Sequence, residues 1–328
     1  MSLVIVLVAG MLLIVLSAGY FTNGVEWLGY RLGLGEGVSG SLLAALGTAL
    51  PETLVPLMAI VFSKDAHQHQ AIGLGAILGA PFMLATLGFS VIGLGVWLGG
   101  RKGEGLRVSK DAMLSDLRFF LVAFGLAIVT VFLPQGVHPL VALALILGYA
   151  MHAWSLVRHR PLDEANEAPL QELHFYRGTT PPVLVIWLQV VIALFGLIIG
   201  AHFFVTGLEQ VTGWVRVTGF LVSVIVTPLA TELPEVLNSI IWIRRRKDTL
   251  AVGNVTGAMA FQASLVPAMG ILLTPWHFTA WEFVTAILAW GAALWTLQRS
   301  RDGLLRLGEL LAAGLFYLLF IGLVVAIL

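Results

Sequence analysis

The chain has 328 residues, of which 59% are hydrophobic and only 11% are charged, and its formal net charge is zero. Its mean hydropathy is +0.95. Soluble domains carry roughly 25% charged residues, so this composition excludes a water-soluble protein and indicates one that crosses a membrane several times. The sequence contains no cysteine, which excludes disulfides, thiolate metal sites and cysteine nucleophiles.

The N-terminal apolar run has no basic residue before it and no clear cleavage pattern. We therefore interpret it as a membrane span and not as a signal peptide. A helix that crosses the hydrocarbon core needs about 20 mostly apolar residues, and dividing the chain at charge clusters and at Gly/Pro punctuation predicts ten such spans. Their limits are 3–24, 38–62, 70–98, 114–133, 139–157, 182–208, 216–242, 250–272, 278–297 and 305–327.

The longest polar connection, residues 158–181, divides these spans into two sets of five. The sequence thus predicts an all-α membrane protein with ten transmembrane helices in two inverted-topology repeats. The first five-helix repeat covers residues 1–160, a cytoplasmic linker covers 161–181, and the second five-helix repeat covers 182–328. Because each repeat has an odd number of spans, the second is inserted upside down relative to the first. Inverted repeats are typical of secondary transporters that bind their substrate at the membrane midplane.

Lys and Arg predict the orientation, because cytoplasmic loops carry an excess of them. All of the 18 basic residues except Lys64 and Arg216 fall on one side of the predicted spans. That side is assigned to the cytoplasm, so both termini are expected outside. We expect a multi-pass protein of a prokaryotic inner (plasma) membrane.

Two Pro-Glu pairs lie deep within predicted spans, at Pro51-Glu52 and Pro234-Glu235. A carboxylate near the bilayer centre costs roughly 2.5–3.5 kcal/mol on insertion scales, so such groups tend to face internal cavities and mark ion paths. Proline lacks an N–H and leaves the carbonyl four residues earlier without its helical donor, here that of Gly47 and of Ala230. A single Pro could be an ordinary kink and a single Glu a structural group. Repetition of the pair, in register with the two halves, favours a cation site built from oxygen ligands.

Each pair is followed by a helix with two glycines four residues apart, Gly75 and Gly79 in the first half and Gly253 and Gly257 in the second. This spacing places both glycines on one helix face, where two backbones can approach closely. We expect the third and eighth spans to pack against the helices that carry the glutamates, although ordinary small-residue packing is an equally simple interpretation.

At these residues the chain resembles the calcium/cation antiporter superfamily, which includes sodium/calcium exchangers and proton-coupled cation exchangers. Residues 47–52 (GTALPE) are similar to the first signature of that family. Residues 230–235 (ATELPE) are similar to its counterpart in the second repeat, and residues 253–257 (GNVTG) to the helix that follows. The resemblance implies a ten-helix bundle that exports a divalent cation, Ca2+ in the first instance, in exchange for H+ or Na+ by alternating access.

The resemblance also implies roles for individual residues. Glu52 and Glu235 match the central cation ligands, and Thr48 and Thr231 match threonines that line the site. The family position five residues after the second glycine, usually Asn or Asp, is Leu84 in the first half and Gln262 in the second. Together with the freed carbonyls and the repeat residue Asn254, these arguments give a candidate site. Its residues are Glu52, Glu235, Thr48, Thr231, Glu232, Gly47, Ala230, Gln262 and Asn254.

Departures from the family pattern bear on the counter-ion. Ala49, Ala80 and Ala258 replace serines, which removes hydroxyl oxygens that would help to hold Na+, and Glu232 stands where another serine is usual. A carboxyl group removed from water favours its protonated form, so these changes favour proton coupling. Glu232 either takes part in proton exchange or forms a structural hydrogen bond to a neighbouring helix.

Other classes of protein are less consistent with the sequence. It has no His-Glu-x-x-His zinc motif and no Gly-x-Ser-x-Gly elbow, which argues against an intramembrane enzyme. A passive cation channel and a diverged relative that carries another cation remain alternatives. Gln189, His202 and Asn238 lie within spans and either line the pathway or serve packing. We expect the lipid bilayer and inorganic cations as partners, no resident cofactor, no nucleic acid, and no requirement for an oligomer.

Overall fold

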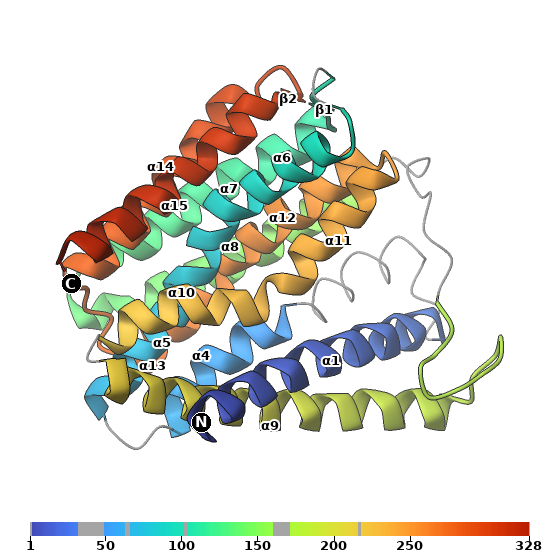
Figure 1. Cartoon of the computed structure of the whole chain (residues 1–328), viewed down its shortest axis with the longest axis horizontal. Helices are drawn as coiled ribbons and strands as arrows, with labels where there is room; N and C mark the ends of the chain where they lie inside the picture. The colour runs from blue at the N-terminus through green and yellow to red at the C-terminus, as the bar shows by residue number, and fades with distance from the viewer. Residues whose placement is uncertain are drawn as a thin grey trace.

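The computed structural model describes residues 2–31, 49–62, 66–101, 104–159, 171–215 and 218–327. These residues form a bundle of long helices with one short strand pair (Figure 1). The elements of the first half are α1 (Ser2–Arg31), α4 (Leu50–Phe62), α5 (Ala66–Met83), the π-helical segment η2 (Leu84–Gly88), α6 (Phe89–Leu98), β1 (Leu106–Arg107), α7 (Lys110–Thr130), η3 (Gln135–Val137) and α8 (His138–His159). Those of the second half are α9 (Val183–Val215), α10 (Gly219–Thr231), α11 (Leu233–Arg244), α12 (Asp248–Gln262), α13 (Leu265–Leu273), α14 (Ala280–Arg299), β2 (Leu304–Leu305) and α15 (Leu307–Ile327).

Within the described residues, eight helical segments are long and apolar enough to cross a membrane. The bent pair α10 and α11, whose axes meet at 47°, makes up to nine, and α4 is a shorter apolar helix. The predicted span 70–98 coincides with the segment Gln70–Leu98, which combines α5, η2 and α6. The predicted second span, 38–62, is described only from residue 49, so the count of ten stays a prediction.

Helices α1 and α9 lie side by side along one edge of the bundle (Figure 1). Glycines allow this close approach, because a Cβ atom at Gly10 would lie 2.5 Å from the backbone nitrogen of Phe204. A cluster of buried apolar side chains joins the pair to α4 and α5 and includes Ile14, Phe21 and Leu197. A larger cluster fills the space among the other helices and includes Phe82, Phe120 and Trp276. Helix α4, which carries the first Pro-Glu pair, packs in the first cluster, and α11, which carries the second pair, packs in the larger cluster.

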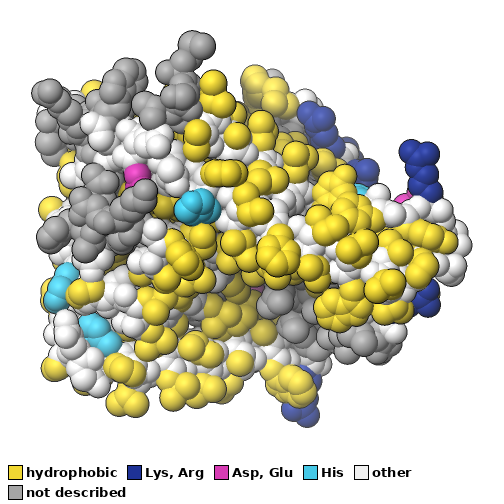
Figure 2. Space-filling model, turned by 90° about the horizontal axis from the view of Figure 1, so that it is seen from below, with side chains coloured by type: hydrophobic (Ala, Val, Ile, Leu, Met, Phe, Trp, Pro, Cys, Tyr) yellow, Lys and Arg dark blue, Asp and Glu magenta, His cyan; other side chains and the backbone are white. Residues whose placement is uncertain are grey.

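Large apolar side chains also cover the outside of the molecule. Figure 2 shows hydrophobic side chains over most of one face, with Lys and Arg gathered toward one end. Leu184 is 79% exposed, and Phe132 and Val122 are each 72% exposed. Contiguous exposed apolar surface on this scale marks an interaction surface, and hydrocarbon is the environment that suits helices whose backbone groups are all bonded internally.

A short antiparallel ladder joins two distant connections at one end of the bundle. Leu106 of β1 pairs with Leu305 of β2, and the N–H of Val108 donates to the carbonyl of Gly303. Beside the ladder, Arg101 binds Asp248 through two hydrogen bonds of 2.7 and 2.8 Å, and both side chains are 10% exposed. The carboxylate of Asp248 raises the pKa of Arg101. Three of the connections predicted on the cytoplasmic side, those after α6, before α12 and before α15, thus lie together in the fold.

In the first half, the two glycines of the third span pack closely against a span that carries a glutamate, as the sequence predicted. A Cβ atom at Gly75 would lie 2.7 Å from the carbonyl oxygen of Phe220, and one at Gly79 would lie 2.8 Å from that of Val224. Both contacts are with α10, so α5 packs backbone to backbone against the helix that leads to Glu232. Gly253 and Gly257 have no such neighbour within 4 Å among the described residues, and the expected partner segment 38–48 lies outside them.

Candidate cation site

Glu52 lies in the first turn of α4, directly after Pro51. Proline suits this position because the first N–H groups of a helix have no intrahelical acceptor. The side chain of Glu52 is turned inward, and the residue is only 3% exposed. Neither of its carboxylate oxygens accepts a hydrogen bond from the described part of the chain. A buried, unsatisfied carboxylate is costly unless a cation or a proton completes it.

Glu232 and Glu235 lie on either side of the start of α11. Helix α10 ends at Thr231, Glu232 adopts φ −93° and ψ −8°, and α11 begins at Leu233 with Pro234 in its first turn. Pro234 cannot donate to the carbonyl of Ala230, and the chain bends at this point as the sequence predicted. The two glutamates are 0% and 1% exposed.

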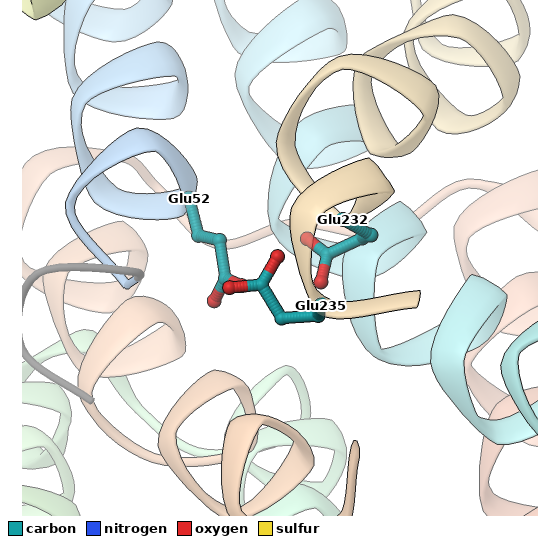
Figure 3. A group of neighbouring side chains, drawn as sticks. All are labelled: Glu52, Glu232 and Glu235. Atoms are coloured by element: carbon teal, nitrogen blue, oxygen red, sulfur yellow. The ribbon is translucent and has the colours of Figure 1, made fainter. Parts of the chain in front are cut away.

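These three glutamates meet in one place (Figure 3). Each offers a carboxylate oxygen that lies within 4.8 Å of the oxygens offered by the other two. They come from α4 and from the junction of α10 with α11, which are segments of the two predicted halves. Three carboxylates this close cannot all stay ionised without a cation or a shared proton. We call Glu52, Glu232 and Glu235 the carboxylate cluster.

Polar neighbours hold one member of the cluster in place. Thr231 donates its hydroxyl to Oε1 of Glu232 at 2.9 Å, and Gln262 donates its amide to Oε2 at 2.8 Å. Gln262 is the last residue of α12 and is fully buried. Its Oε1 atom has no hydrogen-bond donor among the described residues. An amide oxygen beside carboxylates adds the kind of neutral hard ligand that Ca2+ accepts.

The remaining predicted site residues divide into three groups. Ala230 is buried beside the bend. Asn254 donates its amide to the backbone carbonyl of Glu235 at 3.0 Å and to the hydroxyl of Ser239 at 3.3 Å, so this nitrogen supports α11. Gly47 and Thr48 lie outside the described residues.

Within the described part of the chain, the three more weakly implicated polar residues form no hydrogen bond with the side chains of the cluster, and Asn238 lies three residues after Glu235 on α11. Gln189 bonds to α1 through the carbonyl of Tyr20 and the side chain of Asn23, which is a packing role. His202 and Asn238 are exposed. Asp116 and His152 were not predicted as functional residues, yet they form a buried pair at 3.0 Å. Their separation of 36 residues along the chain hides that contact from motif analysis.

The family described as "Sodium/calcium exchanger protein" matches residues 2–157 and 185–326. The chain belongs to the sodium/calcium exchanger family. It is 24% identical over 274 residues to "Inner membrane protein YrbG" of Escherichia coli (strain K12), with 82% of this chain and 79% of that protein covered. It is 25% identical over 274 residues to "Putative antiporter CaxA" of Alkalimonas amylolytica, with coverage of 83% and 81%.

Two solved structures share the fold of this exchanger-family chain. The H+/Ca2+ exchanger CAX has a TM-score of 0.76 at 17% identity and covers 98% of this chain and 82% of its own. A structure of the sodium-calcium exchanger NCX_Mj has a TM-score of 0.61 at 18% identity, with coverage of 98% and 97%. The chain is thus an integral, multi-pass membrane protein of a cation antiporter family, and this family consists of secondary transporters and not enzymes.

Proposed function

We propose that this chain exports a divalent cation, Ca2+ in the first instance, in exchange for H+ or Na+, and binds it at the carboxylate cluster. The observation that carries the proposal is the convergence of Glu52, Glu232 and Glu235 within 4.8 Å in a buried place. Two carboxylates compensate the charge of one divalent ion, and hard oxygen ligands suit Ca2+. We assign Glu52 and Glu235 to the cation, with the oxygen of Gln262 and the carbonyl of Ala230 as further ligands.

H+ is the counter-ion that the cluster supports best. The third carboxylate, Glu232, already has two hydrogen-bond donors, Thr231 and Gln262. Alanines stand at three positions where hydroxyl oxygens would serve Na+. The donors Thr231 and Gln262 stabilise the ionised form of Glu232, so in the proposed cycle this residue can release its proton inside the protein while the other two glutamates bind the divalent ion. The similarity to both an H+/Ca2+ exchanger and a sodium-calcium exchanger makes Na+ the alternative driving ion.

The proposed transport cycle uses two inverted repeats of five helices, with residues 1–160 and 182–328 as the halves. The family match supports this division because it is interrupted only between residues 157 and 185, around the predicted linker. We place both termini outside a prokaryotic inner membrane. The cycle that we propose needs one chain only, because the cluster is built from a single chain.

Flux into proteoliposomes tests the function. Purified protein should accumulate radiolabelled Ca2+ against its gradient when a pH gradient is imposed, with a weaker response or none to an Na+ gradient. Glu52→Gln and Glu235→Gln should abolish uptake, whereas the exposed loop variant Glu172→Gln should match the wild type. Ca2+ flux that only follows the Ca2+ gradient, with no accumulation driven by a pH gradient or an Na+ gradient, would indicate a channel. Uptake of another divalent cation in preference to Ca2+ would revise the substrate.

A further inference from the structure

Asp116, near the start of α7, is buried and bound from two other helices. Its Oδ1 atom lies 3.0 Å from Nε2 of His152 in α8, and its Oδ2 atom accepts a hydrogen bond of 2.7 Å from the hydroxyl of Thr256 in α12. The side chains of Asp116 and His152 are 6% and 8% exposed. This acid–base pair lies inside the protein and is separate from the carboxylate cluster.

Aromatic rings close off the pair from its surroundings. The ring of Phe119 stacks on the imidazole of His152, with centroids 4.4 Å apart and an interplanar angle of 7°. Tyr149, three residues before His152 on α8, contacts the ring of Phe119 and lies edge-on to Phe261 of α12 at 5.6 Å. Charge on the pair is therefore screened less than it would be in water.

Few other charged groups face this pair from the described helices around it. Helix α13, which packs against α8, has no charged side chain. The one charged residue of α12, Asp248, is bound by Arg101 at the helix start. In α14, Glu282 bonds to Thr279 at one end, and Arg299 lies over the ring of Trp295 at the other. The other charged or titratable side chains described on α7 and α8, apart from Tyr149, are exposed or lie at helix ends; they are Lys110, Asp111, Arg118, His138 and Arg158.

Two links connect the pair to the carboxylate cluster. Helix α12, which binds Asp116 through Thr256, also carries Asn254 and Gln262. The first donates to the backbone carbonyl of Glu235 and the second to the carboxylate of Glu232. The second link is a packing contact, because Tyr149, one turn before His152, lies edge-on to Phe261, the residue before Gln262. A change of charge at the pair therefore acts on the cluster through a shared helix and through this contact.

We propose that Asp116 and His152 form a second proton-binding site, and that loss of its proton strengthens divalent-cation binding at the carboxylate cluster. With one proton between them the pair has no net charge. When the proton leaves, a negative charge stays on Asp116, held by the hydroxyl of Thr256, and attracts a cation to the cluster. Histidine is the side chain most often used by proteins to bind and release a proton in response to pH.

Linkage makes the effect reciprocal: a cation bound at the cluster must favour the deprotonated pair by the same factor. This regulatory effect rests on the proposed cation-binding function of the cluster, but the protonation of His152 does not. The two ideas can therefore fail separately.

NMR of histidine-labelled protein in lipid nanodiscs measures the proton site directly. The signal of His152, assigned by its loss in His152→Gln, should change with pH as the pair gains or loses its proton. Asp116→Asn should move the midpoint of that titration, and saturating Ca2+ should shift it to lower pH, while the exposed variant Asp111→Asn should leave it unchanged. A His152 signal that ignores pH, or one that titrates identically in Asp116→Asn, would overturn the proposal.

Equilibrium binding of radiolabelled Ca2+ across the same pH range measures the effect on the cluster. Asp116→Asn should weaken binding on the order of fivefold at about pH 8 and little at about pH 5.5. Thr256→Val should do the same to a smaller extent and provides the test if Asp116→Asn fails to fold. Asp111→Asn and the exposed-loop variant His277→Gln should follow the wild type. A wild-type pH profile in folded Asp116→Asn or Thr256→Val would refute the coupling. Absence of Ca2+ binding in wild-type protein would instead refute the function proposed for the cluster.

Discussion

The two Pro-Glu segments deliver the same side chain to the same place by different local structures. In the first half, Glu52 lies in the first turn of α4 and has no hydrogen-bond donor among the described residues. In the second half, the helix is broken at Glu232, and that residue is held by Thr231 and Gln262. The first half therefore contributes one carboxylate, whereas the second contributes two carboxylates and the groups that hold one of them, Glu232. Two similar motifs can thus bring glutamates to one site although the hydrogen-bond donors are found mainly beside one of them.

The helices that follow show the same contrast at matching positions. Leu84, five residues after Gly79, begins the π-helical segment η2, while Gln262, five residues after Gly257, ends α12. Both helices are irregular at this point, but only the second places a polar group on the cluster. Irregular helix geometry is common at functional sites, and here it occurs in both halves, although of the two matching residues only Gln262 carries a polar side chain.

The largest effects are expected where the two halves are alike. Glu52→Gln and Glu235→Gln each remove a buried charge that the cation compensates, so each should weaken Ca2+ binding at least about a hundredfold. Isothermal titration calorimetry on detergent-solubilised protein measures this change. If one variant binds normally and the other does not, the site belongs to one half alone and the two segments are not equivalent.

Glu232 is the residue by which the halves differ most. If it carries the exchanged proton, Glu232→Gln should retain Ca2+ binding within about tenfold but lose acceleration of uptake by a pH gradient. Gln preserves the hydrogen-bonding shape of the side chain, so a purely structural role predicts unchanged proton coupling. Proteoliposome uptake with and without the gradient distinguishes the two roles.

Exchange of the matching residues Leu84 and Gln262 sharpens the comparison further. Gln262→Leu removes a hydrogen bond to a charged group, worth roughly 1.5–3 kcal/mol, and should weaken Ca2+ binding by about tenfold. Leu84→Gln places an amide in a fully buried apolar position and should lower thermal stability without improving binding. A gain of affinity in Leu84→Gln would show that the first half can regain a ligand at this position.

The smallest effect concerns packing. Gly79→Ala places a Cβ atom 2.8 Å from the carbonyl oxygen of Val224, and relieving this overlap should cost about 1–3 kcal/mol of stability. The exposed helical residue Gly322, with nothing within 4 Å of an added Cβ, is the matched control. Thermal unfolding followed by circular dichroism should show a lower Tm for Gly79→Ala and an unchanged or higher Tm for Gly322→Ala.

Hydropathy predicted most of the helices because the bilayer requires a fixed length of apolar chain. The predicted span 70–98 coincides with the observed segment, and the expected break between α7 and α8 occurs at residues 131–137. The ends of helices were less predictable: α1 continues to Arg31, seven residues beyond its predicted limit of 24, because a helix can extend past the hydrocarbon region. The break between α12 and α13 was not foreseen because residues 262–265 have no proline to mark it.

The site was predictable to the extent that its residues are adjacent in sequence. Repetition of Pro-Glu singled out Glu52 and Glu235, and Glu232 stood out as an additional acid in the second motif. The hydrogen bond between Gln262 and Glu232 depends on contact across 30 residues, and that between Asp116 and Thr256 spans 140. Such contacts depend on how whole helices pack, which no local pattern records.

The strand pair β1 and β2 limits how the bundle can open. It joins the connection after α6 to the one before α15. The neighbouring ion pair between Arg101 and Asp248 links the start of α12 to the same two connections. While the ladder and this ion pair are intact, the three chain segments move together. A motion that separates these segments from one another therefore requires the ladder or the Arg101–Asp248 pair to break.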